Sequence, residues 1–189
     1  SQLSLSLTSS PHLIDHKSSL SAAILAQFQN TTQENNIAAA IFPVLALLSS
    51  DSIPAELIQK AAEWQEFLEL RDDDATTIAQ EAMAVLTKVG LAVYTPKSAD
   101  YSIHPLVQQI IRDSMALSDR RTLAERAVRL VDSTFPVPEH GNWKLCDTLL
   151  PHAKICAGLI AEHSMYTEEA ASLLSKVGHY LLQRSDYSE

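Results

Sequence analysis

Glycine, cysteine and aromatic residues are scarce in this chain of 189 residues, which has four Gly, two Cys and 6% aromatic residues. So few turn-forming glycines argue against a β-sandwich or a barrel. Two cysteines are too few for the disulfide framework of a small secreted domain. Because 46% of the residues are hydrophobic, the chain can bury a core and is not disordered. The composition predicts a folded, mainly α-helical protein.

Long hydrophobic runs are also missing. The longest, Ile37–Leu48, has twelve residues and contains Pro43, whereas a helix needs about 20 apolar residues to cross a bilayer. Residues 1–20 lack the basic start and apolar stretch of a secretory signal. We therefore expect a cytoplasmic protein that makes no membrane contact.

Basic residues are outnumbered, with 14 Lys and Arg against 23 Asp and Glu and a net charge of −9. The imbalance is strongest over residues 49–118, which carry five basic and eleven acidic side chains. A protein that binds DNA needs clustered positive charge to neutralise phosphates. The charge argues against DNA as a partner of this region.

Hydrophobic spacing predicts a mostly helical order. Residues 1–15 are polar and rich in serine, which is typical of a tail. We expect Pro54 at the first position of its helix, Asp74 as an N-cap and Gly90 as a left-handed helix end. Trp64–Leu70 either continue the helix that Pro54 begins or form a separate turn. The expected helices cover 18–28, 37–48, 54–62, 76–89, 105–117, 119–134, 143–164 and 168–184.

Two short β-like runs, Leu91–Thr95 and Tyr101–His104, flank a turn at Pro96–Asp100 and predict a hairpin. Helices followed by a small hairpin and a helix back form a winged-helix layout. We divide the chain into a tail and linking helix over 1–34, a winged-helix domain over 35–118, and antiparallel helices over 119–189.

The last predicted helix fits the first helix of a tetratricopeptide repeat. Leu174 takes the bulky fourth position, Val177 and Gly178 the Leu-Gly pair, and Leu181 the aromatic position, with Asp186 and Tyr187 in the turn. The sequence ends at Glu189, before a second helix of the repeat. We therefore expect the native sequence to continue into a repeat array.

Five segments in this order resemble one family, over about residues 35–189. Ile53–Ile58, Leu86–Leu91 and Ser102–Gln108 are similar to the winged-helix part of NB-ARC proteins, a branch of the STAND signalling NTPases. Cys146–Ala153 and Leu174–Tyr187 resemble the bacterial and fungal members that carry tetratricopeptide repeats as sensors.

The resemblance implies that His104 reaches the β-phosphate of ADP and helps to hold a closed, inactive state. Its neighbours Ile103 and Pro105 stand where plant members have Met and Asp. The resemblance also implies an upstream nucleotide-binding domain that binds ADP or ATP with Mg²⁺, a protein or peptide ligand at the repeats, and a homo-oligomer after activation. The residues alone leave another interpretation open, in which His104 packs beneath the hairpin and bonds a carbonyl.

No catalysis is expected from this chain. It has no Gly-x-x-x-x-Gly-Lys-[Ser/Thr] and no Gly-x-Ser-x-Gly, so it lacks both a phosphate-binding loop and a nucleophile elbow. His152, Cys156 and His163 share a helix face, but about 16 Å separates the outer two at 1.5 Å per residue. Cys146 and Cys156 are expected to be buried. We expect no metal and no cofactor in the chain itself, although His152 and Cys156 with a third ligand stay open.

Two other functions fit the same features. One is a winged-helix transcription regulator that reads DNA with the helix Thr76–Val89. The other is a tetratricopeptide scaffold that binds a peptide. Our main interpretation is a regulatory segment that couples a nucleotide switch to a repeat sensor, without enzymatic activity of its own.

Overall fold

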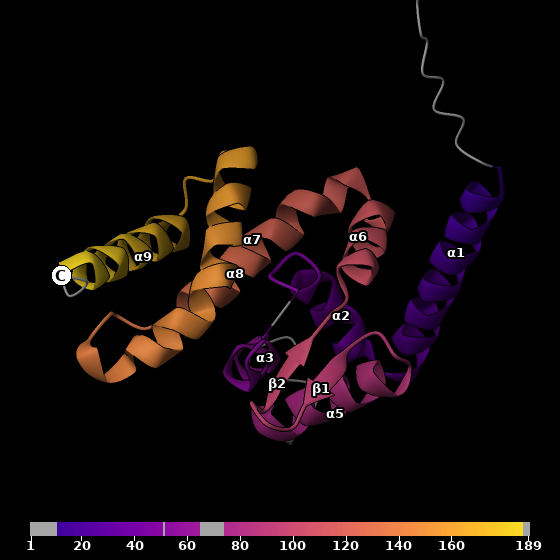
Figure 1. The fold of residues 1–189 in the computed structure, drawn as a ribbon, viewed down its shortest axis with the longest axis horizontal. Helices are drawn as coiled ribbons and strands as arrows, with labels where there is room; N and C mark the ends of the chain where they lie inside the picture. Colours follow the sequence, from indigo (N-terminus) through magenta and orange to yellow (C-terminus); the bar gives the residue numbers. More distant parts are fainter. Residues whose placement is uncertain (1–10, 51, 65–73, 187–189) are drawn as a thin grey trace, which may run out of the picture.

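Helices make up most of the computed structural model, which describes residues 11–50, 52–64 and 74–186 (Figure 1). The prediction of a mainly helical protein with one small hairpin is confirmed. None of the described helices is both long enough and apolar enough to span a bilayer. The elements are α1 (Pro11–Glu34), α2 (Asn36–Leu45), α3 (Ala55–Ala62), α5 (Ala75–Lys88), β1 (Val93–Thr95), β2 (Asp100–Ser102), α6 (Pro105–Ser114), α7 (Leu117–Thr134), the 3-10 turn η1 (His140–Asn142), α8 (Trp143–Glu162) and α9 (Glu168–Asp186).

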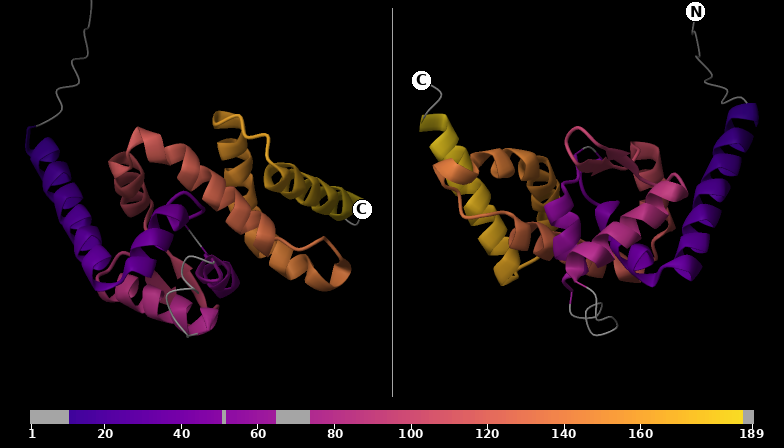
Figure 2. Two further views of the ribbon diagram at one scale, coloured as in Figure 1. Left: turned by 180° about the vertical axis from the view of Figure 1, so that it is seen from behind. Right: turned by 90° about the horizontal axis from the view of Figure 1, so that it is seen from below.

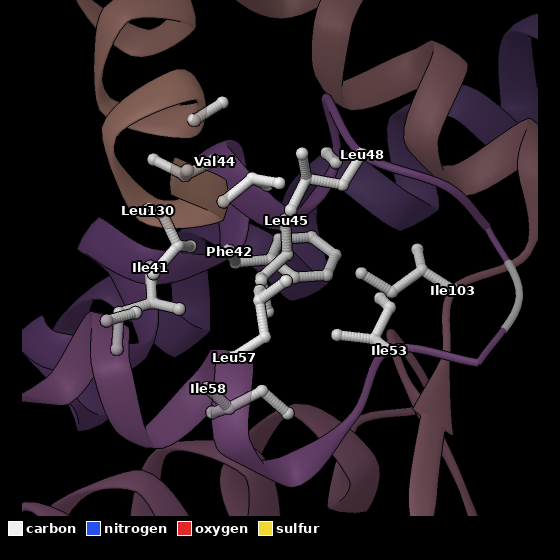
Figure 3. Close-up of a cluster of buried hydrophobic side chains, with 14 of the residues drawn as sticks. Ile41, Phe42, Val44, Leu45, Leu48, Ile53, Leu57, Ile58, Ile103 and Leu130 are labelled. Atoms are coloured by element: carbon white, nitrogen blue, oxygen red, sulfur yellow. The ribbon is translucent and has the colours of Figure 1, made fainter. Parts of the chain in front are cut away.

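The core is built around α2, which is apolar on nearly every side. Ile41, Phe42, Val44 and Leu45 have no exposed surface. In Figure 3 they lie between Leu130 of α7 on one side and Ile53 and Ile103 on the other. Buried residues from α1 to α9 form one continuous hydrophobic cluster, so the burial that stabilises α2 also holds the helices that follow the hairpin.

The α1 helix is much longer than the predicted segment 18–28, and the expected tail over 1–15 is wrong for residues 11–15, which are helical. The polar run after Phe28 belongs to the same helix, and within it Thr31 is buried against the rest of the protein. Thr31 Oγ1 donates to the Gln27 carbonyl at 3.0 Å, and Thr32 Oγ1 donates to that of Gln29 at 2.6 Å. Residues 1–10 lie outside the described part of the chain.

Asn35 separates α1 from α2 by capping the second helix. Its side-chain oxygen accepts a hydrogen bond from the Ala38 N–H at 2.8 Å, which satisfies one of the free donors at a helix start. Pro43 lies inside α2, and the helix ends two residues later at Leu45. This is earlier than the predicted end at Leu48.

Pro54 precedes α3 instead of opening it, so the prediction that places it inside the helix is wrong. Its backbone is extended, with φ −72° and ψ 151°. The reason is tertiary, since the preceding Ile53 pairs with Tyr101 like a strand residue. The two backbone hydrogen bonds between them have N to O distances of 2.7 and 2.9 Å. The helix ends at Ala62, so it does not continue through Trp64. Residues 65–70 lie outside the described part of the chain.

The hairpin is short and antiparallel, with Tyr94 opposite Tyr101 and their ring centroids 5.0 Å apart. Because Ile53 pairs with the other edge of β2, three chain segments lie side by side at this point. Such support matters because an isolated two-stranded hairpin is only marginally stable in water.

Both predicted signals for α5 are confirmed. Asp74 accepts from the Thr77 N–H at 2.8 Å, and Gly90 follows the helix with φ +77°. A β-carbon at Gly90 would meet no atom within 4 Å, so only the backbone conformation requires glycine there.

Replacing Gly90 with alanine is therefore expected to lower the free energy of unfolding by about 1 kcal/mol, because L-residues disfavour the left-handed region. Gly141→Ala is the matched control, since Gly141 has equal free space and no positive φ. Urea unfolding followed by circular dichroism measures both variants. Equal stabilities for Gly90→Ala and Gly141→Ala would contradict this explanation.

The three last helices pack together, with α7 in contact with both α8 and α9, and α7 also packs against α2 and α3. Figures 1 and 2 show α1 and α9 at opposite ends of the molecule. Two acidic residues connect α7 and α8 to α9. Asp132 of α7 accepts from Lys176 at 2.9 Å, and Asp147 of α8 accepts from Tyr180 at 2.6 Å and from Arg184 at 3.0 Å. The domain boundaries at 34 and 118 stay predictions.

Candidate functional site

His104 lies between the end of β2 and the first residue of α6, with its ring exposed. Its Nδ1 accepts a hydrogen bond from the Leu106 N–H at 3.1 Å, so the side chain caps α6. Because a backbone N–H can only donate, the proton of the neutral ring is on Nε2. Among the described residues, Nε2 has no hydrogen-bond partner. The site therefore presents one N–H donor in a fixed position.

The residues on both sides of His104 are anchored. Ile103 is buried, and its N–H donates to the Ser50 carbonyl at 2.9 Å. Pro105 begins α6, where its fixed φ favours the helix. One turn later the buried Gln108 donates to the Leu48 carbonyl at 3.1 Å. A histidine held at both ends is suited to precise contact with a ligand.

The interpretation of His104 as a packed residue that bonds a carbonyl is wrong, because the ring is exposed and accepts from a backbone N–H. The prediction of a phosphate contact stays a prediction. His104 also lies outside two clefts that described residues form. One, of about 240 Å³, lies between α3, α5 and the hairpin, and the other, of about 230 Å³, lies between α6, α7 and the end of α8.

The second notable histidine, His152, is completely buried in α8 and bonds to the loop between α2 and α3. Its Nδ1 accepts from the Ser49 N–H at 3.3 Å. Its Nε2 lies 3.1 Å from the Ser52 carbonyl and therefore carries the proton. The sequence indicated His152 only as a possible metal ligand together with Cys156. Its place beside Leu149 and Ala153 on the buried face of α8 was the available signal that it needs polar partners.

These contacts leave no free ring nitrogen on His152 for a metal ion. Burial raises the pKa of the Cys156 thiol to about 12, and its sulfur lies 3.7 Å from the Ala127 carbonyl. Cys146 is also buried, as predicted. Within the described residues, no group of three or more His, Cys, Asp or Glu side chains could hold a metal ion.

Protonation of His152 is opposed by its surroundings. Burial lowers the pKa of His152, while the bond to the Ser52 carbonyl and the charge of Asp100 partly offset this effect. In the unfolded chain the ring regains an ordinary pKa of about 6.5. Below that pH the unfolded state binds more protons than the folded state, so folding stability falls as pH decreases toward the folded pKa.

We expect this loss to reach at most about 1.4 kcal/mol per pH unit below pH 6.5. Replacing His152 with glutamine removes the titrating group and should flatten this part of the profile. Urea unfolding between pH 7 and 5 measures both proteins, with His179→Gln as an exposed control. An equal slope of stability against pH for wild type and His152→Gln would contradict the assignment of this pH dependence to His152.

Ser52 and Asp100 lie near His152, yet the three do not form a catalytic triad. Ser52 Oγ donates to the Asp100 carboxylate at 2.8 Å, and His152 bonds the Ser52 backbone carbonyl, not its hydroxyl. In this arrangement the histidine does not activate the hydroxyl as a general base would.

The exposed face of α5 is poor in positive charge. Lys88 is the only basic residue of this helix, and it forms an ion pair with Glu34 of α1 at 2.8 Å. Thr76, Gln80 and Glu81 are exposed polar residues of the same helix, and none of them carries a positive charge. Such a face has little with which to neutralise DNA phosphates.

Comparisons with known proteins give a distant relationship. Residues 27–120 match a family described as a domain of unknown function (DUF7779). A nucleotide-binding leucine-rich repeat (NLR)-like protein from Hyaloscypha variabilis is 24% identical over 168 residues, which are 87% of this chain. The chain spans 16% of the length of that relative. No solved structure matches the chain significantly.

Proposed function

We propose that this chain is the coupling segment of a STAND-type signalling NTPase, which links a nucleotide switch to a helical sensor. The exposed Nε2–H of His104 carries the proposal, because it is a rigidly held donor suited to a phosphate oxygen. The distant similarity to an NLR-like protein over most of the chain supports it.

The arrangement before residue 118 supports the proposal that this part is a winged helix. Along the chain, α2 is followed by the strand-like Ile53, then by α3, α5, the hairpin β1–β2 and α6. Ile53 pairs with the free edge of β2, which is consistent with the wing of such a domain. His104 follows this wing directly.

The surface of α9 supports the proposal that a tetratricopeptide array begins there. Leu174 and Leu181 are 44% and 45% exposed, and together with Gly178 they follow a helical spacing of four and three residues along one side. A β-carbon at Gly178 would meet no atom within 4 Å. Packing within this chain therefore does not require glycine, whereas close approach of another helix would.

The proposed mechanism is a shift between two states of the parent protein. An upstream domain would bind ADP, or ATP with Mg²⁺, and in the closed state His104 would donate to a phosphate of ADP. A protein or peptide ligand at the repeats would favour an open state, in which the parent forms a homo-oligomer. We place this switch in the cytoplasm, and this segment contributes contacts without performing hydrolysis.

The experiment for this function is to purify the parent protein with its native flanking sequence, denature it, and identify the released nucleotide by chromatography. Stoichiometric ADP supports the nucleotide switch. A nucleotide-free parent that also binds no added ADP in calorimetry contradicts it.

Gly178→Ala tests the repeat part of the proposal. In the 189-residue chain we expect this change to raise the free energy of unfolding by up to about 1 kcal/mol, because alanine is the better helix former and the space is free. In the parent, a next helix packed closely against Gly178 would collide with the added methyl group, so the same change would lower the free energy of unfolding.

Gly158→Ala is the matched control, since Gly158 lies in α8 with the same free space and is exposed. We expect it to stabilise both proteins. Thermal unfolding measures all four variants, and stabilisation of the parent by Gly178→Ala would contradict a helix packed on this side of α9.

A further inference from the structure

The loop between α2 and α3 is bonded to α8 on one side. His152 accepts from the Ser49 N–H and donates to the Ser52 carbonyl, over distances of 3.3 and 3.1 Å. Both ring nitrogens form hydrogen bonds, so the imidazole bridges Ser49 and Ser52. We call this pair of hydrogen bonds the His152 clamp. Among the helices, α8 has its main contacts with α7 and α9, and His152 gives it a direct connection to the first half of the chain.

The same loop is bonded to the hairpin on its other side. The Ser50 carbonyl accepts from the Ile103 N–H at 2.9 Å, and the Ser52 hydroxyl donates to Asp100 at 2.8 Å. Ile53 then pairs with Tyr101 in both directions. Ile103 and Tyr101 belong to the segment that ends at His104. The loop between α2 and α3 is therefore bonded both to His152 and to the residues that precede His104.

We propose that His152 is a positioning residue for His104, through which the helices α7–α9 hold the end of β2 in place. This inference rests on the proposed function of His104 as a phosphate contact. His152 binds no nucleotide itself. Its hydrogen bonds hold Ser49 and Ser52 in place, and Ser50 lies between these two residues in the chain. The Ser50 carbonyl in turn accepts from the N–H of Ile103, the residue before His104.

The backbone of Ser52 makes the loop dependent on this clamp. Its φ is +53°, a conformation that serine adopts at a cost and keeps only where surrounding contacts enforce it. His152 and Asp100 supply such contacts from α8 and β2. If α8 moves away, the backbone of Ser52 can leave its left-handed conformation. This change would alter the bonds of Ser50 to Ile103 and of Ile53 to Tyr101, and through them the end of β2.

Amide hydrogen exchange of the 189-residue chain, measured by NMR, tests this inference. In His152→Leu we expect exchange at Ser49, Ile103 and Leu106 to accelerate at least tenfold more than at Leu130 in α7, which reports global unfolding. The Leu106 amide is informative because it bonds to His104 Nδ1.

Two further variants complete the test. His152→Gln can keep the donor to the Ser52 carbonyl, so it should show a smaller effect at the same amides, and it replaces the leucine variant if that variant does not fold. Lys154→Leu, an exposed change on α8, should alter none of them.

Acceleration at Ser49 alone, or equal acceleration at all amides including Leu130, overturns the inference. In the first case the clamp is local, and in the second it stabilises the whole fold without selectivity. This measurement needs no nucleotide. A parent without bound ADP would therefore refute the proposed function while leaving the exchange result interpretable, and a nucleotide-bound parent with unaltered exchange at Ile103 and Leu106 would refute only the role of His152.

Discussion

Replacing His104 with alanine in the parent protein is expected to accelerate the release of ADP about ten- to a hundredfold. A hydrogen bond to a charged group contributes about 1.5–3 kcal/mol, and the exposed Nε2–H is the group that we assign to the phosphate. The measurement is the displacement of a fluorescent ADP analogue by excess ADP in stopped flow.

His104→Asn separates this contact from the structural role of the side chain. Asparagine is a good N-cap and can keep the bond to the Leu106 N–H, but it has no nitrogen at the position of Nε2. Both variants should release ADP rapidly, and only His104→Ala should also lose about 1 kcal/mol of stability. Normal release from His104→Asn would assign the histidine to helix capping alone.

Replacing His152 with leucine is expected to lower the free energy of unfolding of the 189-residue chain by about 2–3 kcal/mol at pH 7.5. The change leaves the Ser49 N–H and the Ser52 carbonyl without their partners, and each such loss costs about 1–3 kcal/mol when buried. Two such losses sum to about 2–6 kcal/mol. Because water can reach the exposed Ser52, we expect a total near the lower end of this sum. Urea unfolding followed by circular dichroism measures it.

Lys154→Leu is the control for this prediction, since it introduces the same side chain on an exposed position of α8. We expect a change within about 0.5 kcal/mol, as for surface substitutions in general. A His152→Leu variant as stable as this control would mean that the two bonds contribute nothing to folding.

Local signals in the sequence predicted much of the fold. Asp74 and Gly90 mark the two ends of α5, and Pro105 marks the start of α6. Each signal depends on a few neighbouring residues and on backbone preferences that are the same in any protein. The position of His104 at the end of the hairpin was predictable for the same reason.

Contacts between distant residues explain what the sequence did not predict. Local signals favour Pro54 inside α3, because no nearby residue shows that Ile53 pairs with Tyr101. The partners of His152 lie about 100 residues away in the chain, so periodicity indicates its burial but not its bonds. The polar end of α1 is not predictable from the sequence, because Thr31 is buried against the rest of the protein and no local pattern reveals this burial.

The most direct test of the proposed coupling role is isothermal titration of this 189-residue chain into the separately purified nucleotide-binding domain that we propose for its parent. We expect the chain to bind the ADP-loaded domain and to bind the same domain at least tenfold more weakly with a non-hydrolysable ATP analogue, and we expect His104→Asn to abolish this difference. Binding of equal strength with both nucleotides, or no binding with either, would contradict the proposal that His104 senses the nucleotide state.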